Sequence, residues 1–242
     1  MPHFFISLGQ RLNTVGWNAH ASTNLRYETC VPEGKCLTPY GKPKKTYTKN
    51  EFKVDSAIFK LNKGDIGKCK SDKKPTGGYK YSGRQEITHK LLPGKNIFEA
   101  EILTSGAPQY RSHFFQIHDG RSKGKPPSMV SVNKDWMIRN QHSIDCFKPN
   151  CKQLSYDSYL KPGERKNFKA EVEYINKEKK ISATYYLDGE LIIQHLNVPL
   201  DTKKTDGPYG PNRPYIKIGM YRIGDTGTTT FSYNKIVLKN KR

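Results

Sequence analysis

The stretch Tyr215-Ile216-Lys217-Ile218-Gly219-Met220-Tyr221 alternates between two sets of side chains with a period of two. Because successive side chains of a β-strand point to opposite faces of a sheet, the alternation predicts a strand. Lys217 and Tyr221 then project from one face, and the two isoleucines and the methionine project from the other. This strand is expected to carry a cation and a phenol side by side.

Two other short segments have polar residues with the same period. Segment 114–118 places Gln116 and His118 on one face, and segment 84–88 pairs Arg84 with Glu86. Three strands would thus offer one polar face. His113 lies one residue out of phase with Gln116, so we expect it on the opposite face, in a structural role like that of the remaining histidines.

Strand patterns continue along the chain, and no amphipathic helix pattern interrupts them. The dipeptide Asp188-Gly189 between two alternating runs predicts a tight hairpin. Many short strands with few helices are typical of a two-sheet sandwich or jelly roll, so we expect an all-β fold of two antiparallel sheets. The expected strands are 52–61, 84–92, 96–104, 112–118, 129–132, 136–139, 168–175, 181–187, 191–196, 215–221 and 228–238.

The chain has 242 residues, a length at which an all-β sandwich forms one domain. We expect a single domain over 1–242, with a loop-rich N-terminal lead-in at 1–50 and a core at 52–238. There are 42 Lys and Arg against 22 Asp and Glu, which gives a net charge of +20. Such a field attracts polyanions, and nucleic acid, an anionic membrane surface or an acidic polysaccharide would all fit it. The chain contains no run of about 18 apolar residues, so we expect no membrane-spanning helix.

The cysteines form two close pairs and one single residue, namely Cys30 with Cys36, Cys146 with Cys151, and Cys69. This pattern is compatible with small disulfides in a secreted protein, so we expect an extracellular location. Neither pair has the two-residue spacing of a zinc knuckle, and no Asp-rich calcium pattern occurs. We therefore expect no metal site.

The polar side chains of the three segments are the groups that elimination at a uronate requires. Arg84 and Gln116 suit neutralisation of the carboxylate, which acidifies the adjacent C5 proton, and Lys217 can reinforce that field. His118, with an ordinary pKa of about 6.5, suits the base. Tyr221 suits the acid that protonates the departing O4 oxygen, and it can act as a base where cations favour the phenolate. This chemistry needs no cofactor.

The uronate epimer limits which side chain can act as the base and which as the acid. In gluco- and manno-configured uronates the C5 proton and O4 lie on one side, so Tyr221 alone can take the proton and deliver it. In gulo- and ido-configured uronates they lie on opposite sides, so His118 would be the base and Tyr221 the acid. Each residue also has a structural alternative, since His118 and Tyr221 can be ordinary sheet residues and Arg84 can form a structural ion pair with Glu86.

In the same order along the chain, the three segments resemble signatures of the jelly-roll polysaccharide lyases, a group that holds the alginate lyases of family 7, glucuronan lyase and heparin lyase I. Segment 84–88 is similar to R-[ST]-E-[LV]-R, segment 116–118 matches Q-[IV]-H, and segment 215–222 resembles Y-F-K-A-G-[VI]-Y-N. The resemblance covers about residues 52–238. It implies a jelly roll whose concave sheet binds a polyanion. The residues that it places at the reacting uronate are Arg84, Gln116, His118, Lys217 and the catalytic Tyr221.

Three departures from these signatures place a polar residue of another kind. Gln85 replaces the small hydroxyl residue, Thr88 replaces the second arginine, and Arg222 stands where alginate lyases often have Asn. The missing arginine sets the chain apart from alginate lyases proper, and Met220-Tyr221-Arg222 looks closer to glucuronan and heparin lyases.

We therefore expect a polysaccharide lyase that cleaves a uronate-containing anionic polysaccharide by β-elimination and leaves 4,5-unsaturated uronate ends. The polymer would be of the glucuronan or alginate type, or a glycosaminoglycan. The alternative is a non-catalytic binding module for acidic polysaccharide. A nucleic-acid-binding protein lacks a recognisable signature, and a glycoside hydrolase lacks a partner carboxylate for Glu86. The expected partner is the polymer, with no nucleic acid or membrane, and the protein is expected to be a monomer.

Overall fold

The computed structural model describes residues 26–27, 45–48, 51–65, 82–107, 109–119, 126–142, 151–153, 157–200, 214–224 and 227–241. In these ranges the regular secondary structure is β-strand, and no helix is present that could cross a membrane. The strands are β1 (Arg26–Tyr27), β2 (Lys45–Thr48), β3 (Glu51–Leu61), β4 (Ser82–Lys90), β5 (Gly94–Gly106), β6 (Arg111–His118), β7 (Ser128–Asn133), β8 (Ile138–His142), β9 (Cys151–Gln153), β10 (Arg165–Ile175), β11 (Lys180–Leu187), β12 (Glu190–Pro199), β13 (Tyr215–Ile223) and β14 (Thr229–Lys241).

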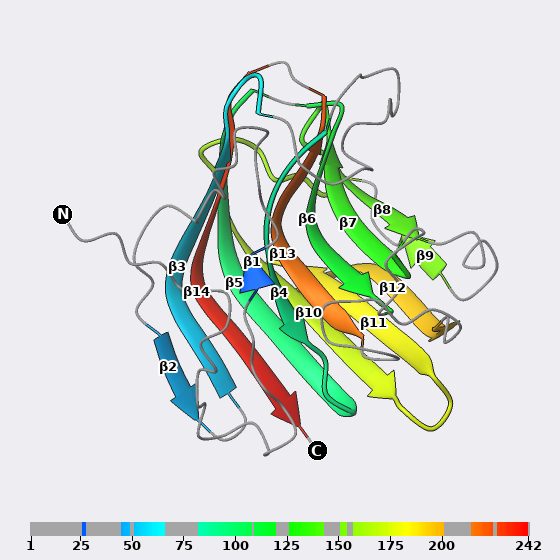
Figure 1. Ribbon diagram of the computed structural model, residues 1–242. Helices are drawn as coiled ribbons and strands as arrows, with labels where there is room; N and C mark the ends of the chain where they lie inside the picture. The colour runs from blue at the N-terminus through cyan, green and yellow to red at the C-terminus, as the bar shows by residue number, and fades with distance from the viewer. Residues whose placement is uncertain are drawn as a thin grey trace.

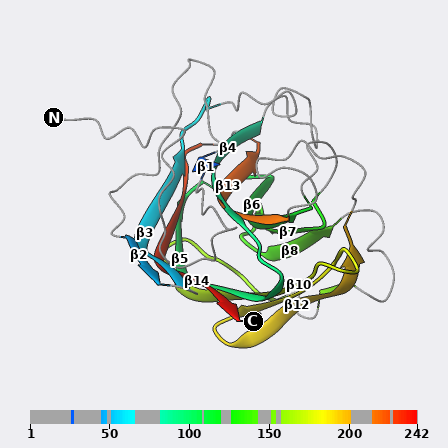
Figure 2. The same ribbon diagram turned by 60° about the horizontal axis from the view of Figure 1, so that its bottom comes forward.

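The strands form two antiparallel sheets that pack face to face and bend together (Figures 1 and 2). The six-stranded sheet has the order β1-β4-β13-β6-β7-β8, and the eight-stranded sheet has the order β2-β3-β14-β5-β10-β11-β12-β9. Neighbours in both sheets come from distant parts of the chain, as in β13 between β4 and β6. The expected jelly-roll sandwich of two antiparallel sheets is confirmed.

All eleven strands expected from the alternating patterns are present, although their ends differ by a few residues. The 136–139 strand begins later than expected, at Ile138, because Trp136 has a φ of 61° and lies in the turn after β7. The hairpin between β11 and β12 is confirmed. Its central residues, Asp188 and Gly189, have φ values of 48° and 88°, the left-handed conformation that a two-residue hairpin turn requires.

Three short strands were not expected from the sequence. β1 and β2 lie within the lead-in that was expected to be loop-rich, and each pairs at one end of a sheet. β9 pairs with β12 and contains Cys151. The other cysteines lie outside the described residues, so the expected disulfides stay a prediction.

An aromatic cluster joins the two sheets. Phe114 and Phe115 of β6 point inward from the six-stranded sheet, and both contact Phe168 of β10, with ring centroids 5.2 and 5.5 Å apart. Phe98 of β5 lies 5.2 Å from Phe115. These rings are almost completely buried, and such aromatic pairs add about 0.5–1.5 kcal/mol each to the free energy of area burial. The cluster fixes β6 on the opposite sheet.

Candidate active site

The strands that carry the three sequence segments are direct neighbours in the six-stranded sheet. β13 pairs with β4 so that Tyr221 lies opposite Arg84, and it pairs with β6 so that Lys217 lies opposite Gln116. The intervening Ile216 and Ile218 face the core between the sheets. The polar residues therefore share the outer face of the six-stranded sheet, as the alternation predicted.

Glu86 lies at the centre of this polar face. Its carboxylate accepts a hydrogen bond from Gln116 Nε2, and it lies 3.5 Å from Arg84 Nη1 and 3.6 Å from Lys217 Nζ. The side chain is 1% exposed, and that of Lys217 is 4% exposed. Three donors around one buried acid match the ionised carboxylate. Glu86 therefore organises the three residues that were expected to bind a uronate.

The hydrogen bonds of Gln116 fix which nitrogen of His118 carries the proton. A carboxylate can only accept, so the amide nitrogen of Gln116 must face Glu86, and its oxygen faces His118 Nε2 at 3.2 Å. In the neutral imidazole the proton therefore sits on Nε2 and the lone pair on Nδ1. The ring of His118 also stacks on Tyr215, with centroids 4.9 Å apart and planes 10° apart. The chain thus holds His118 in one orientation and one tautomer.

Tyr221 is held between its two cross-strand neighbours. The Arg84 guanidinium lies over the phenol ring, 4.5 Å from its centroid. On the other side, the imidazole of His113 stacks on the same ring, with centroids 5.5 Å apart and planes 23° apart. Tyr221, Arg84 and His118 are half-buried, whereas Gln116 is buried. A bound ligand would meet the three half-buried groups first.

The expectation that His113 faces away from Gln116 is wrong, because β6 and β13 are out of step between these residues. Ile218 lies opposite Phe115 and Tyr221 lies opposite His113, so two residues of β13 face one residue of β6. On its other edge β6 has one extra residue relative to β7, because His113 lies opposite Ser131 and Phe115 lies opposite Val130. Phe114 and Phe115 therefore both face the core, and the alternation of β6 reverses there. His113 thereby joins the site face, where burial and the charges of Arg111 and Arg84 lower its pKa to about 3.

Tyr233 of the eight-stranded sheet supports this bulge from the core. Its hydroxyl accepts the N–H of Gly219 at 3.3 Å, and it lies 2.7 Å from the carbonyl of Phe114 and 3.0 Å from that of Gly219, to one of which it donates. Burial raises the pKa of Tyr233, so the hydroxyl keeps its proton. Backbone groups that the bulge removes from regular pairing are thus satisfied by the opposite sheet.

Gly219 is required at the bulge for two reasons. Its φ is 132°, a conformation that residues with a Cβ rarely adopt, and a Cβ would collide with the carbonyl of Gln85 on β4. The close approach of β4 to β13 therefore depends on glycine at this position.

Two of the three departures from the lyase signatures point away from the site. Gln85 accepts a hydrogen bond from the Lys60 N–H on β3. Arg222 is fully buried on the core side and donates to the carbonyls of Leu61, Asn62, Asp65 and Gly227. Thr88, in contrast, pairs with Lys217 on β13 and is buried. Of the three departures, the one at residue 88 alone belongs to the site face.

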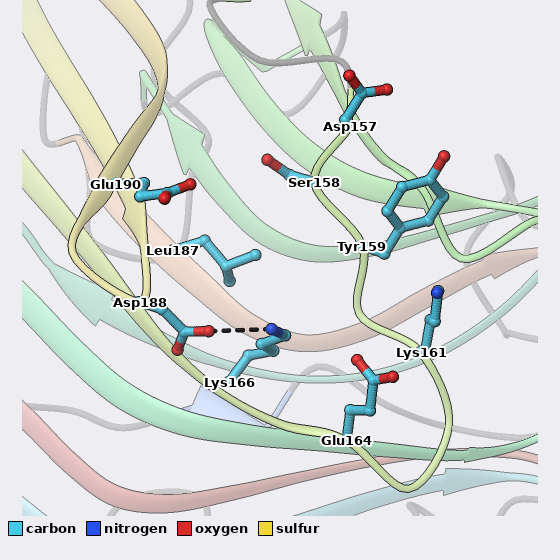
Figure 3. A pocket seen from close by; sticks show the side chains of 9 residues that line it. All are labelled: Asp157, Ser158, Tyr159, Lys161, Glu164, Lys166, Leu187, Asp188 and Glu190. Carbon is cyan, nitrogen blue, oxygen red and sulfur yellow. Dashed lines mark ion pairs between the residues drawn. The ribbon is translucent and has the colours of Figure 1, made fainter.

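A cavity of about 390 Å³ lies elsewhere, beside the β11–β12 hairpin (Figure 3). Its wall includes an ion pair between Lys166 and Asp188 at 3.0 Å. None of its lining residues comes from β4, β6 or β13. In the described ranges, no group of three or more His, Cys, Asp or Glu side chains could hold a metal ion.

No protein-family model and no curated protein sequence matches the chain. Solved structures do match. The alginate lyase AlgAT5 of polysaccharide lyase family 7 is 14% identical with a TM-score of 0.54, over 91% of this chain and 95% of that one. An alginate lyase from Corynebacterium sp. is 13% identical with a TM-score of 0.50, over 87% and 86%. At these identities the likeness concerns the fold, and the fold is that of the jelly-roll alginate lyases.

Proposed function

We propose that this protein is a polysaccharide lyase that cleaves a uronate-containing anionic polysaccharide by β-elimination. The observation that carries the proposal is the grouping of half-buried Tyr221 and His118 beside the donors of Arg84, Gln116 and Lys217 on one sheet face. The shared fold with two alginate lyases and the net charge of +20 support it.

The first step is neutralisation of the uronate carboxylate. Gln116 has a second amide hydrogen beyond the one given to Glu86, and Arg84 has further N–H groups. Donors fixed by Glu86 before the substrate arrives need little reorganisation, and such preorganisation is the main source of electrostatic stabilisation in enzymes. They favour the negative charge that develops on the carboxylate when the C5 proton leaves.

The proton transfers complete the elimination. A base takes the C5 proton, the electron pair forms the C4–C5 double bond, and the C4–O4 bond breaks. The acid then protonates the departing O4, which becomes the new reducing end, and the other fragment ends in a 4,5-unsaturated uronate. For gulo- and ido-configured uronates, His118 Nδ1 is the base and Tyr221 the acid. For gluco- and manno-configured uronates, Tyr221 does both.

The positions of the departing residues favour a polyuronate over a heavily sulfated polymer, and the fold shared with alginate lyases points to alginate among the polyuronates. Gln85 and Arg222 make contacts on the core side, so their difference from the alginate-lyase signatures has no direct effect on substrate. Thr88 removes one cation from the site face, which fits a polymer with one charge per sugar better than a heavily sulfated one. Action on such a polymer also implies an extracellular protein, and the substrate can be bound by a monomer.

The test is the ultraviolet absorbance of the conjugated unsaturated uronate during incubation with separate samples of alginate, glucuronan, heparin, heparan sulfate, chondroitin and ulvan. We expect a rise with alginate and a loss of about 10²–10⁴-fold in rate for Tyr221→Phe, because the proton donor is removed. Tyr186→Phe is the matched control, since Lys169 lies 5.1 Å from the centroid of that ring on the eight-stranded sheet.

Each outcome decides between the two functions. Absorbance that is lost in Tyr221→Phe and kept in Tyr186→Phe supports the lyase and names its polymer. Binding of a polymer without any absorbance change would indicate a non-catalytic binding module instead.

A further inference from the structure

Arg111 lies on the same sheet face as the candidate catalytic residues. It differs from Arg84 and Lys217 on that face in its ion pairs. It begins β6, opposite Ile223 of β13 and Asn133 of β7. Its guanidinium is half-buried and lies 5.3 Å from the ring centroid of Tyr110. Among the described residues, no carboxylate forms an ion pair with it, whereas Arg84 and Lys217 both contact Glu86.

Asn133 provides a second set of unused donors at the same place. Its side-chain oxygen accepts the backbone N–H groups of Asp135 at 2.9 Å and Met137 at 3.0 Å. These contacts fix the amide orientation, and its Nδ2 donors have no protein partner within the described ranges. Directly opposite residues of neighbouring antiparallel strands have their Cβ atoms about 4.5–5.5 Å apart, so the guanidinium and the amide can contact one ligand.

The guanidinium of Arg111 is partly removed from water. Burial lowers the pKa of Arg111, although the nearby Tyr110 partly opposes this. His113 lies on the same face, two positions after Arg111 in the sequence, and is fully buried. Its Nδ1 atom has no hydrogen-bond partner in the described part of the chain. A partly dehydrated cation without a counter-ion is stabilised when an anion binds beside it.

We propose that Arg111 and Asn133 bind the anionic group of a sugar that adjoins the sugar reacting at Tyr221. This inference rests on the proposed function for the identity of the polymer. The bulge leaves about four strand steps between Arg111 and Gln116, or roughly 13 Å at about 3.3 Å a step. The two sites are therefore far enough apart to hold the charges of different sugars of one chain.

The chemistry of this second site resembles that of the first. In each, a guanidinium and a primary amide lie on one face, Arg84 with Gln116 and Arg111 with Asn133. A guanidinium fork binds the two oxygens of a carboxylate, and it binds a sulfate ester as well. The difference is that no buried acid occupies the second pair among the described residues, so its donors can all be used by the ligand.

Arg111→Gln tests the inference, and Arg165→Gln is the matched control. Arg165 belongs to the eight-stranded sheet, its side chain is 58% exposed, and the change lowers the net charge by the same amount. We expect Arg111→Gln to raise KM for polymeric alginate about tenfold, as loss of a charge-assisted hydrogen bond does, with kcat changed less than about twofold. The control should match the wild type. Arg111→Lys, which keeps the charge without the fork, should fall between them.

Calorimetry with an alginate hexasaccharide tests binding without turnover when both arginine variants are made in the inactive Tyr221→Phe protein. If no polymer gives unsaturated product, the lyase proposal fails, and weaker hexasaccharide binding by Arg111→Gln than by Arg165→Gln still supports the second site. A heparin hexasaccharide affected more strongly than the alginate one would assign the site to sulfate rather than carboxylate. Equal KM and equal Kd for the two variants would overturn the inference.

Discussion

Two ion pairs of equal length lie on the two sheets. Lys217 Nζ and Glu86 Oε2 are 3.6 Å apart on the six-stranded sheet, with side chains 4% and 1% exposed. Lys239 Nζ and Glu99 Oε2 are also 3.6 Å apart on the eight-stranded sheet, with side chains 40% and 41% exposed. Distance is therefore not what distinguishes them. The first pair is removed from water and held by further donors, and only such a pair can present a fixed charge pattern to a ligand.

The strands themselves show the same contrast. In β11 buried and half-buried residues alternate along the whole strand, because one of its faces packs on the core and the other faces outward. In β13 eight of nine residues are buried, and the exception is Tyr221. A buried polar face needs internal partners for its charges, and Glu86 provides them for Arg84, Gln116 and Lys217.

The largest effect is expected for Glu86→Gln. Removal of the carboxylate breaks the buried ion pair with Lys217, so we expect a loss of about 3–5 kcal/mol in the free energy of unfolding. Glu99→Gln, which breaks the pair of equal length on the exposed sheet, should cost less than about 1 kcal/mol. Urea unfolding of both variants measures the difference, and equal losses would contradict the role of burial.

A pH effect of intermediate size is expected for His113→Phe. In the folded state His113 is neutral down to about pH 3, because its pKa is lowered from 6.5, while the unfolded chain binds a proton near 6.5. The free energy of unfolding is therefore unaffected by protonation of this residue above about pH 6.5. It falls by about 1.4 kcal/mol per pH unit as the pH drops from there toward 3, because the unfolded chain takes up the proton first. Phe keeps the stacking on Tyr221 but does not titrate, so unfolding measured between about pH 6 and 4 should vary less with pH. An unchanged slope would count against this.

The smallest stability change is expected for Tyr233→Phe, with Tyr185→Phe as its matched control. Both tyrosines are fully buried on the eight-stranded sheet and reach across the core, one to the bulge at Gly219 and the other to Ser128. Each loses a buried hydroxyl, so both should be destabilised by about 1–3 kcal/mol. Only Tyr233→Phe should also lower kcat, because the bulge positions His113 and Tyr221. Equal kcat for both variants would rule out that role.

Much of the fold, and which residues share the polar face, could be predicted from the sequence. Strand position and facing depend on alternation within a few residues, so the hairpin at Asp188-Gly189 and the shared face of Lys217 and Tyr221 could be predicted locally. The resemblance of three segments to known signatures also pointed to the fold that the solved structures share with this chain.

The arrangement of these residues depends on contacts between strands and between sheets. Facing within a strand is a local property, but it reverses at a bulge, and the irregularity of β6 at Phe114 depends on how β6 pairs with β13 and β7. The prediction that His113 faces away from Gln116 was wrong for that reason. The central position of Glu86 was also not predictable, because its donors come from three strands. Tyr233 supports the site from the opposite sheet, and a contact between sheets has no signal in the alternation of either strand.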